Sequence, residues 1–106
     1  MLTLRSINTP TDGTIKILSR RITDDAVREK LMDGKITAVG FIQGPFANVV
    51  VAGDIAEKTS NVVIADIIGN CPQHITMIGV FGDTSSVAEA LKSVETWEKK
   101  GYGAFE

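Results

Sequence analysis

The only cysteine and the only histidine of the chain lie in one short polar stretch between two apolar runs. Cys71 and His74 have the Cys-x-x-His spacing of half a zinc site, and a cysteine thiolate is also the usual ligand of iron–sulfur clusters. An iron–sulfur cluster needs three or four thiolates, so a single chain with one cysteine cannot hold a cluster alone. The residues themselves leave three interpretations open: a small buried thiol with His74 beginning the next strand, a zinc half-site, or a ligand shared between several copies of the chain.

The carboxylates near this stretch do not suggest catalysis. Asp66 has no second carboxylate or nucleophile placed to work with it, and we expect it to be a solvated strand end. Asp83 precedes a run of hydroxyl residues and is expected to cap a helix. We therefore predict that the chain is not an enzyme.

Length and composition predict one small cytoplasmic domain. Of 106 residues, 43% are hydrophobic and only 6% aromatic, so the core is expected to be aliphatic. The 11 basic residues are scattered and the net charge is −2, which argues against a nucleic-acid partner. One cysteine excludes an internal disulfide and suits a reducing compartment. Met1–Gly13 lacks the apolar core of a signal peptide, and no apolar run approaches the roughly 20 residues of a membrane span, so we expect no membrane partner.

The first third of the chain contains a turn cluster and then two predicted elements. Residues 1–13 are expected to form an N-terminal arm and loop ahead of a single domain, residues 14–106. Alternating apolar and polar residues over Thr14–Ile22 predict a strand. A short helix should follow, capped by Thr23 and ended by Gly34.

The middle of the chain predicts a buried strand and a helix. The apolar run Ile36–Ile42 is typical of a central strand that is buried on both faces. Pro45 suits the first position of a helix, which we expect to continue over Phe46–Thr59. Its β-branched residues leave a strand over Asn48–Ala52 as the alternative. Gly53 within the helix indicates close packing against a neighbouring element.

The last third predicts a hairpin and a final helix. Strands over Asn61–Ile68 and Ile75–Gly82 are joined by the short turn Gly69–Gln73, which favours an antiparallel pair. Ser86 and Glu89 have the spacing of a capping box at the start of the last helix. The whole order, β-α-β-α-β-β-α, predicts an α+β fold: a ferredoxin-like sandwich with helices on one face of the sheet.

Two segments resemble the hexameric shell proteins of bacterial microcompartments, which share the BMC domain. Gly44–Val62 resembles that family's first helix and its AAD-x-x-x-K-x-A-N-V ending. Phe81–Ala90 resembles its x-G-D-V-x-A-V-x-x-A turn from strand to helix. The resemblance covers about Gly34–Val94, and the elements before it are similar to the circularly permuted branch. It implies a circularly permuted BMC domain and a place in a microcompartment shell, within the cytoplasm.

The turn itself is similar to the G-x-C-P-Q pore loop of the shell protein associated with glycyl-radical enzymes, the GrpU type. The resemblance implies an iron–sulfur cluster at the central pore of a homohexamer, bound by Cys71 from several subunits. It implies a pore loop of five residues: Gly69, Asn70, Cys71, Pro72 and Gln73. It also implies that Lys58 and Asn61 lie at the edge where hexamers meet. The expected partners are other shell proteins and a lumenal or cytosolic redox protein.

Symmetry explains how a single cysteine per chain could be sufficient. A cyclic hexamer would place six copies of Cys71 around one axis, and we expect three or four of them to bind a cluster, of 4Fe-4S type and at most one per hexamer. Such a cluster implies electron transfer or cluster delivery across the shell. The alternatives are a metabolite-conducting pore with free thiols and a small ferredoxin-like metal-binding or regulatory domain that uses Cys71 and His74.

Overall fold

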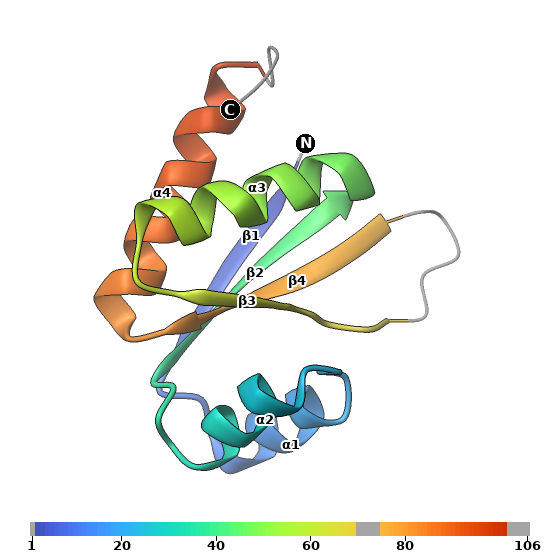
Figure 1. The fold of residues 1–106 in the computed structure, drawn as a ribbon, viewed down its shortest axis with the longest axis vertical. Coiled ribbons are helices and arrows are strands. Elements are labelled where there is room, and N and C mark those ends of the chain that lie inside the picture. The colour runs from blue at the N-terminus through green and yellow to red at the C-terminus, as the bar shows by residue number, and fades with distance from the viewer. Residues whose placement is uncertain (1, 70–74, 102–106) are drawn as a thin grey trace.

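The computed structural model of the chain describes residues 2–69 and 75–101, which form four strands and four helices (Figure 1). In chain order they are β1 (Thr3–Asn8), α1 (Asp12–Ser19), α2 (Asp25–Met32), β2 (Ala38–Pro45), α3 (Phe46–Thr59), β3 (Val63–Asp66), β4 (Ile75–Gly82) and α4 (Thr84–Lys99). The strands form one antiparallel sheet in the order β1-β2-β4-β3. β2 and β4 are therefore the inner strands, and β1 and β3 are the edges.

Helices cover both faces of the sheet. In Figure 1, α3 and α4 lie on one side of it and α1 and α2 on the other. Each inner strand contributes side chains to both faces of the sheet. Ile42 and Val80 pack in the cluster with α3 and α4, and Val39 and Phe81 pack in the cluster with α1 and α2. The central strand predicted over Ile36–Ile42 is confirmed, whereas the expectation that all helices lie on one face is wrong.

The segment Thr14–Ile22 is helical, so the strand predicted there is wrong. α1 occupies most of it and presents Ile15 and Leu18 to the core, three residues apart as on one side of a helix, and Ile22, which follows the helix, packs in the same cluster. Ile17, which the alternating pattern grouped with Ile15, is 61% exposed. The segment has apolar residues at strand spacing and at helix spacing, and packing against the sheet favours the helix.

The expected N-terminal arm is also different, because residues 1–13 contain β1 and the start of α1. β1 pairs with β2 along its whole length. Four of its six residues are exposed, so an apolar pattern is nearly absent from its sequence. The backbone N–H of Leu2 donates to Oε2 of Glu98 at 2.5 Å, which ties the start of the chain to the last turn of α4. Such proximity of the first strand to the last helix is an arrangement in which circular permutation of a domain is tolerated.

α2 begins one residue later than the sequence indicated. Its N-cap is Asp24 rather than Thr23, and Oδ1 of Asp24 accepts the backbone N–H of Val27 at 3.1 Å. Gly34 follows the helix with a φ of 79°, a left-handed conformation that glycine adopts without strain. The stop predicted at Gly34 is confirmed.

α4 is capped by Asp83, as predicted. Oδ1 of Asp83 accepts the backbone N–H of Ser86 at 2.8 Å and the hydroxyl of Ser85 at 3.1 Å. The bond from the Ser86 N–H, and then the two serine side chains, lower the pKa of Asp83 below its ordinary value of 3.8. The capping box predicted for Ser86 and Glu89 is not formed, because the helix already begins at Thr84.

α3 spans Phe46–Thr59 as predicted, and the alternative strand over Asn48–Ala52 is wrong. Pro45 is the last residue of β2 and the N-cap of the helix, one position earlier than expected. A Cβ atom at Gly53 would lie 2.7 Å from Cδ1 of Ile78 and 2.9 Å from Cδ1 of Ile64. The close packing predicted at Gly53 is therefore confirmed.

Two glycines allow a matched test of how tightly the core cluster that contains Phe81 is packed. A Cβ atom at Gly79 would lie 2.6 Å from Cε2 of Phe81, whose ring is fully buried, whereas a Cβ atom at Gly13 in α1 would meet nothing within 4 Å. We expect Gly79→Ala to lower the free energy of unfolding by about 1–3 kcal/mol through overpacking. Gly13→Ala should raise it by about 0.5 kcal/mol by restricting the unfolded chain. Urea unfolding of both variants at equal protein concentration measures the difference, and equal stabilities would contradict the packing described for Phe81.

Candidate functional site

The candidate site is the connection between β3 and β4. Gly69 is exposed and is the last described residue before it. Five of its residues lie outside the described part of the chain: Asn70, Cys71, Pro72, Gln73 and His74. The ligand role of Cys71 and the pore-loop role of its neighbours therefore stay predictions, and the structure describes the base that carries them.

The two strands at the base form the predicted antiparallel hairpin. β3 pairs with β4 from Val63↔Phe81 to Asp66↔Ile78, and the N–H of Ile67 continues the pairing to the carbonyl oxygen of Met77 at 3.1 Å. β3 is shorter than the strand expected over Asn61–Ile68, but the ladder reaches almost to Gly69. The hairpin therefore brings the end of β3 and the start of β4 to the same end of the sheet (Figure 1).

The connection between α1 and α2 also contacts this base. Ile22 forms an antiparallel bridge with Ile67, and both side chains are buried, at 2% and 3% exposure. The N–H of Ile68 donates to the carbonyl oxygen of Arg21 at 2.9 Å, and Nη1 of Arg21 donates to the carbonyl oxygen of Ile68 at 3.1 Å. Sequence reasoning missed Arg21, because its partner is 47 residues away and no local pattern marks such a contact.

Exposed apolar side chains surround this end of the sheet. Ile68 is 50% exposed and Ile75 is 39% exposed. Phe46, 65% exposed, lies at the same end, because Pro45 before it is the register partner of Ile75. Large apolar side chains grouped at one surface are typical of a contact with another protein chain.

A cavity of about 160 Å³ lies at the base of the connection. It is lined by Gln43, Ile67, Ile68, Gly69, Ile75, Thr76 and Met77. The donors that a metal would need are not gathered elsewhere: in residues 2–69 and 75–101, no group of three or more His, Cys, Asp or Glu residues could hold a metal ion. A thiolate is the right donor for an iron–sulfur cluster, but one chain supplies only one, so the donor set fits the cluster only when several chains contribute.

The two residues predicted for the hexamer edge lie near the end of α3. Lys58 is in its last turn with a side chain that is 61% exposed, and its Nζ lies 2.7 Å from Oδ2 of Asp54. Asn61 is exposed in the short link to β3. Both side chains are accessible to another molecule, and the edge role stays a prediction.

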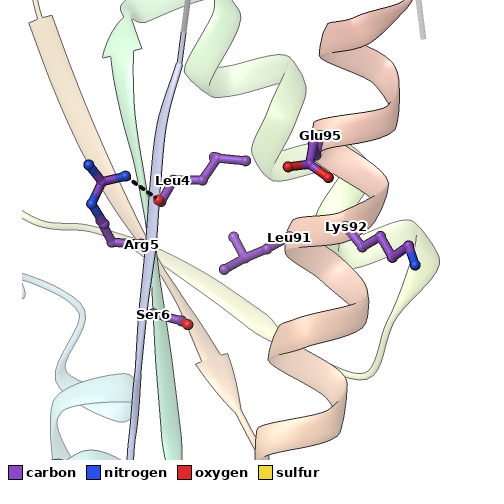
Figure 2. A pocket seen from close by; sticks show the side chains of 6 residues that line it. All are labelled: Leu4, Arg5, Ser6, Leu91, Lys92 and Glu95. Carbon is purple, nitrogen blue, oxygen red and sulfur yellow. Dashed lines mark hydrogen bonds between the residues drawn. The ribbon is translucent and has the colours of Figure 1, made fainter.

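A second cavity, of about 520 Å³, lies between β1 and α4 (Figure 2). Leu4 and Leu91 point into the space between the two elements, while Arg5 points away from α4 and donates from Nη1 to the carbonyl oxygen of Leu4 at 2.8 Å. Ser6, Lys92 and Glu95 complete its lining. None of these residues is a histidine or a cysteine, and the groove is best described as the open flank of the edge strand.

Comparison with solved structures identifies the fold and the family. The ligand-free GrpU microcompartment shell protein from Clostridiales bacterium 1_7_47FAA is 33% identical over 94% of this chain and 95% of its own, with a TM-score of 0.65. Its counterpart from Pectobacterium wasabiae is 31% identical over 88% of this chain and 99% of its own, with a TM-score of 0.66. The chain belongs to the microcompartment shell proteins of the GrpU type. The predicted fold class, a permuted BMC domain, is therefore confirmed, and so is the prediction of a structural protein of the microcompartment shell rather than an enzyme.

With two more distant proteins, this GrpU-type chain shares only the fold. EtuB from Clostridium kluyveri is 16% identical, with a TM-score of 0.59, and the trimeric shell protein PduB is 20% identical, with a TM-score of 0.54. Each match covers 94% of this chain and 43% of the other. A scan of protein-family models and a comparison with curated proteins gave no match. Among the described residues, no helix is both long and apolar enough to cross a membrane.

Proposed function

We propose that this shell protein forms homohexamers that tile the microcompartment shell, and that an iron–sulfur cluster of 4Fe-4S type is held at the central pore by Cys71 from several subunits. The observation that carries the proposal is the position of the only cysteine of the chain. It follows Gly69 by two residues, on a connection whose base is held by the β3–β4 hairpin and by the α1–α2 connection. A turn carried on such a base can project the same atom from every subunit toward one axis.

The surface around the base supports a ring of subunits. Phe46, Ile68 and Ile75 are large and exposed in the single chain, and a neighbouring subunit would cover them. PduB, which shares the fold, is trimeric, so closed assemblies occur among proteins with this fold. In a closed ring each subunit uses two different surfaces, so one cysteine per chain becomes a ring of thiols at the axis.

A cluster at the axis would supply one-electron chemistry at the pore. The residues of this chain would provide thiolate ligands through Cys71, and Asn70 and Gln73 would offer side-chain N–H groups to the sulfur atoms. Three or four of the six thiols are sufficient for a cluster, and a cyclic ring has a single axis, so at most one cluster per hexamer is expected. The implied role is electron transfer or cluster delivery across the shell.

Size and metal content measured on anaerobically purified protein test the proposal. We expect light scattering to report a hexamer, and iron and sulfide analysis to give well below one cluster per chain, with an electron resonance signal after reduction or oxidation. A colourless hexamer with reactive thiols would instead support the metabolite-conducting pore. A monomer or dimer would overturn the hexamer, and if it bound zinc, it would support the small metal-binding domain that uses Cys71 and His74.

Lys58→Ala tests the proposed hexamer edge. We expect electron microscopy to show loss of extended sheets, while light scattering still reports hexamers. The exposed pair of Lys58 with Asp54 contributes within about 0.5 kcal/mol, so the folded subunit should be unaffected. Lys99→Ala is the matched control, because Lys99 also lies in the last turn of a helix and pairs with a carboxylate four residues earlier, Glu95. Sheets that survive Lys58→Ala would remove this residue from the edge.

A further inference from the structure

Arg21 holds the end of β3 by two hydrogen bonds. Its carbonyl oxygen accepts the N–H of Ile68, and its guanidinium donates to the carbonyl oxygen of the same residue. Both backbone polar groups of Ile68 are therefore bound by one residue. Beyond the last strand pair, Asp66↔Ile78, this contact is the one that fixes the backbone of Ile68 within the described residues.

The segment that contains Arg21 is itself held firmly. Nη1 of Arg28 donates to the carbonyl oxygen of Ile22 at 2.9 Å, and its Nη2 pairs with Asp25 at the start of α2. The side chain of Ile22 is 2% exposed and packs in the cluster that joins α1 and α2 to the sheet. A contact from Arg21 therefore connects the end of β3 to a packed pair of helices rather than to a free loop.

We propose that Arg21 is a positioning residue for Cys71, acting through Ile68. The proposal rests on the proposed function, because it gives a role to Arg21 only if Cys71 binds a metal cluster. Ile68 precedes Cys71 by three residues, and among the described residues it is the one nearest to Cys71 in the chain whose two backbone polar groups are both bound. Groups that orient metal ligands from outside the coordination sphere strongly affect metal affinity.

The neighbouring arginine allows the contact to be separated from the charge. Arg20 and Arg21 line the same open cavity of about 340 Å³, together with Ile17 and Ile68. Both arginines are exposed and carry the same charge, but only Arg21 bonds to Ile68 within the described chain. Arg20→Met and Arg21→Met thus remove the same charge and the same donors, and they differ in the loss of the side-chain bond to the carbonyl oxygen of Ile68, since the backbone bond between Ile68 and Arg21 does not depend on the side chain.

The single cysteine makes a direct test possible in the assembled, metal-free protein. A nitroxide label attached sparsely to Cys71 reports how freely the turn moves, whether or not a cluster binds. We expect faster label motion in Arg21→Met than in the wild type, and unchanged motion in Arg20→Met. Arg21→Gln, with a shorter and neutral side chain, should change the motion in the same direction and replaces Arg21→Met if that variant does not assemble.

The second measurement is cluster binding by the same variants. We expect Arg21→Met to bind iron and sulfide about 10-fold more weakly than the wild type and to have a changed electron resonance spectrum. Arg20→Met should behave like the wild type in both measurements. Wild-type label motion and wild-type iron affinity in Arg21→Met would overturn the role of Arg21. An equal change in both arginine variants would also overturn it, because charge alone would then explain the result. If the wild-type protein bound no iron, the proposed function would be wrong instead. The label data would then still test whether the contact of Arg21 with Ile68 restricts the motion of the turn.

Discussion

Replacing Cys71 by serine is expected to remove iron and sulfide from the protein while leaving its assembled size unchanged. Serine keeps the volume of the side chain but offers a hydroxyl in place of the thiolate that clusters require. Because Cys71 is the only cysteine, no other thiol of the chain can replace it. Within residues 2–69 and 75–101, the apolar side chains of two core clusters build the fold, and we expect them to keep the subunit folded in Cys71→Ser.

Iron and sulfide analysis, electron resonance and light scattering on the same anaerobic preparation measure the result. His74→Ala is the control within the turn: a cluster bound by thiolates alone should survive it, whereas a Cys-x-x-His zinc site should not. Full retention of iron in Cys71→Ser would exclude Cys71 as a ligand. Loss of the assembly together with the iron would make Cys71 a structural residue.

Phe81→Ala is expected to have the largest effect on stability. The Phe81 side chain is 1% exposed and packs in the cluster formed by α1, α2 and one face of the sheet. Removing a buried phenyl ring costs about 3–5 kcal/mol, through lost burial and the cavity left behind. A small domain has a free energy of unfolding of only about 5–15 kcal/mol, so the loss is a large share of the total.

The chain contains a matched control for this substitution. Met32→Ala also truncates a large apolar side chain to alanine, at a position that is 63% exposed and has no role in the proposed ring contact, and we expect a change in stability within about 0.5 kcal/mol. Urea unfolding at one fixed protein concentration compares the two variants, because assembly makes stability depend on concentration. Similar midpoints for Phe81→Ala and Met32→Ala would show that the layer under α1 and α2 contributes little to the fold.

The sequence predicted best the parts of the fold whose residues have a single consistent pattern. The apolar run Ile36–Ile42 and the hairpin strand Ile75–Gly82 are both mainly apolar stretches of strand length, and both strands are confirmed. The helix Phe46–Thr59 is also confirmed, although its β-branched residues left a strand as the alternative. Thr14–Ile22 has apolar residues at both strand and helix spacing, and only its packing against the sheet distinguishes them. Thr3–Asn8 is mostly exposed, so it had almost no apolar pattern to interpret.

The candidate site shows the same division between local and long-range information. Residue types were sufficient to single out the turn that contains Cys71, because its only thiol and histidine stand out in the sequence. They could not reveal Arg21, because its contact with Ile68 forms only when α1 and α2 pack on the far face of the sheet. An error of secondary structure over Thr14–Ile22 therefore hid the residue that holds the base of the site.

The exposed edge strand β1 has a consequence for the resistance of the single subunit to aggregation. An open strand edge can recruit other chains and begin aggregation, and a charged side chain on it is a common natural protection. Arg5 sits on β1, and its guanidinium binds the carbonyl oxygen of Leu4 on the same strand. The single subunit thus carries a positive charge on its exposed edge strand, which disfavours pairing of this edge with other chains.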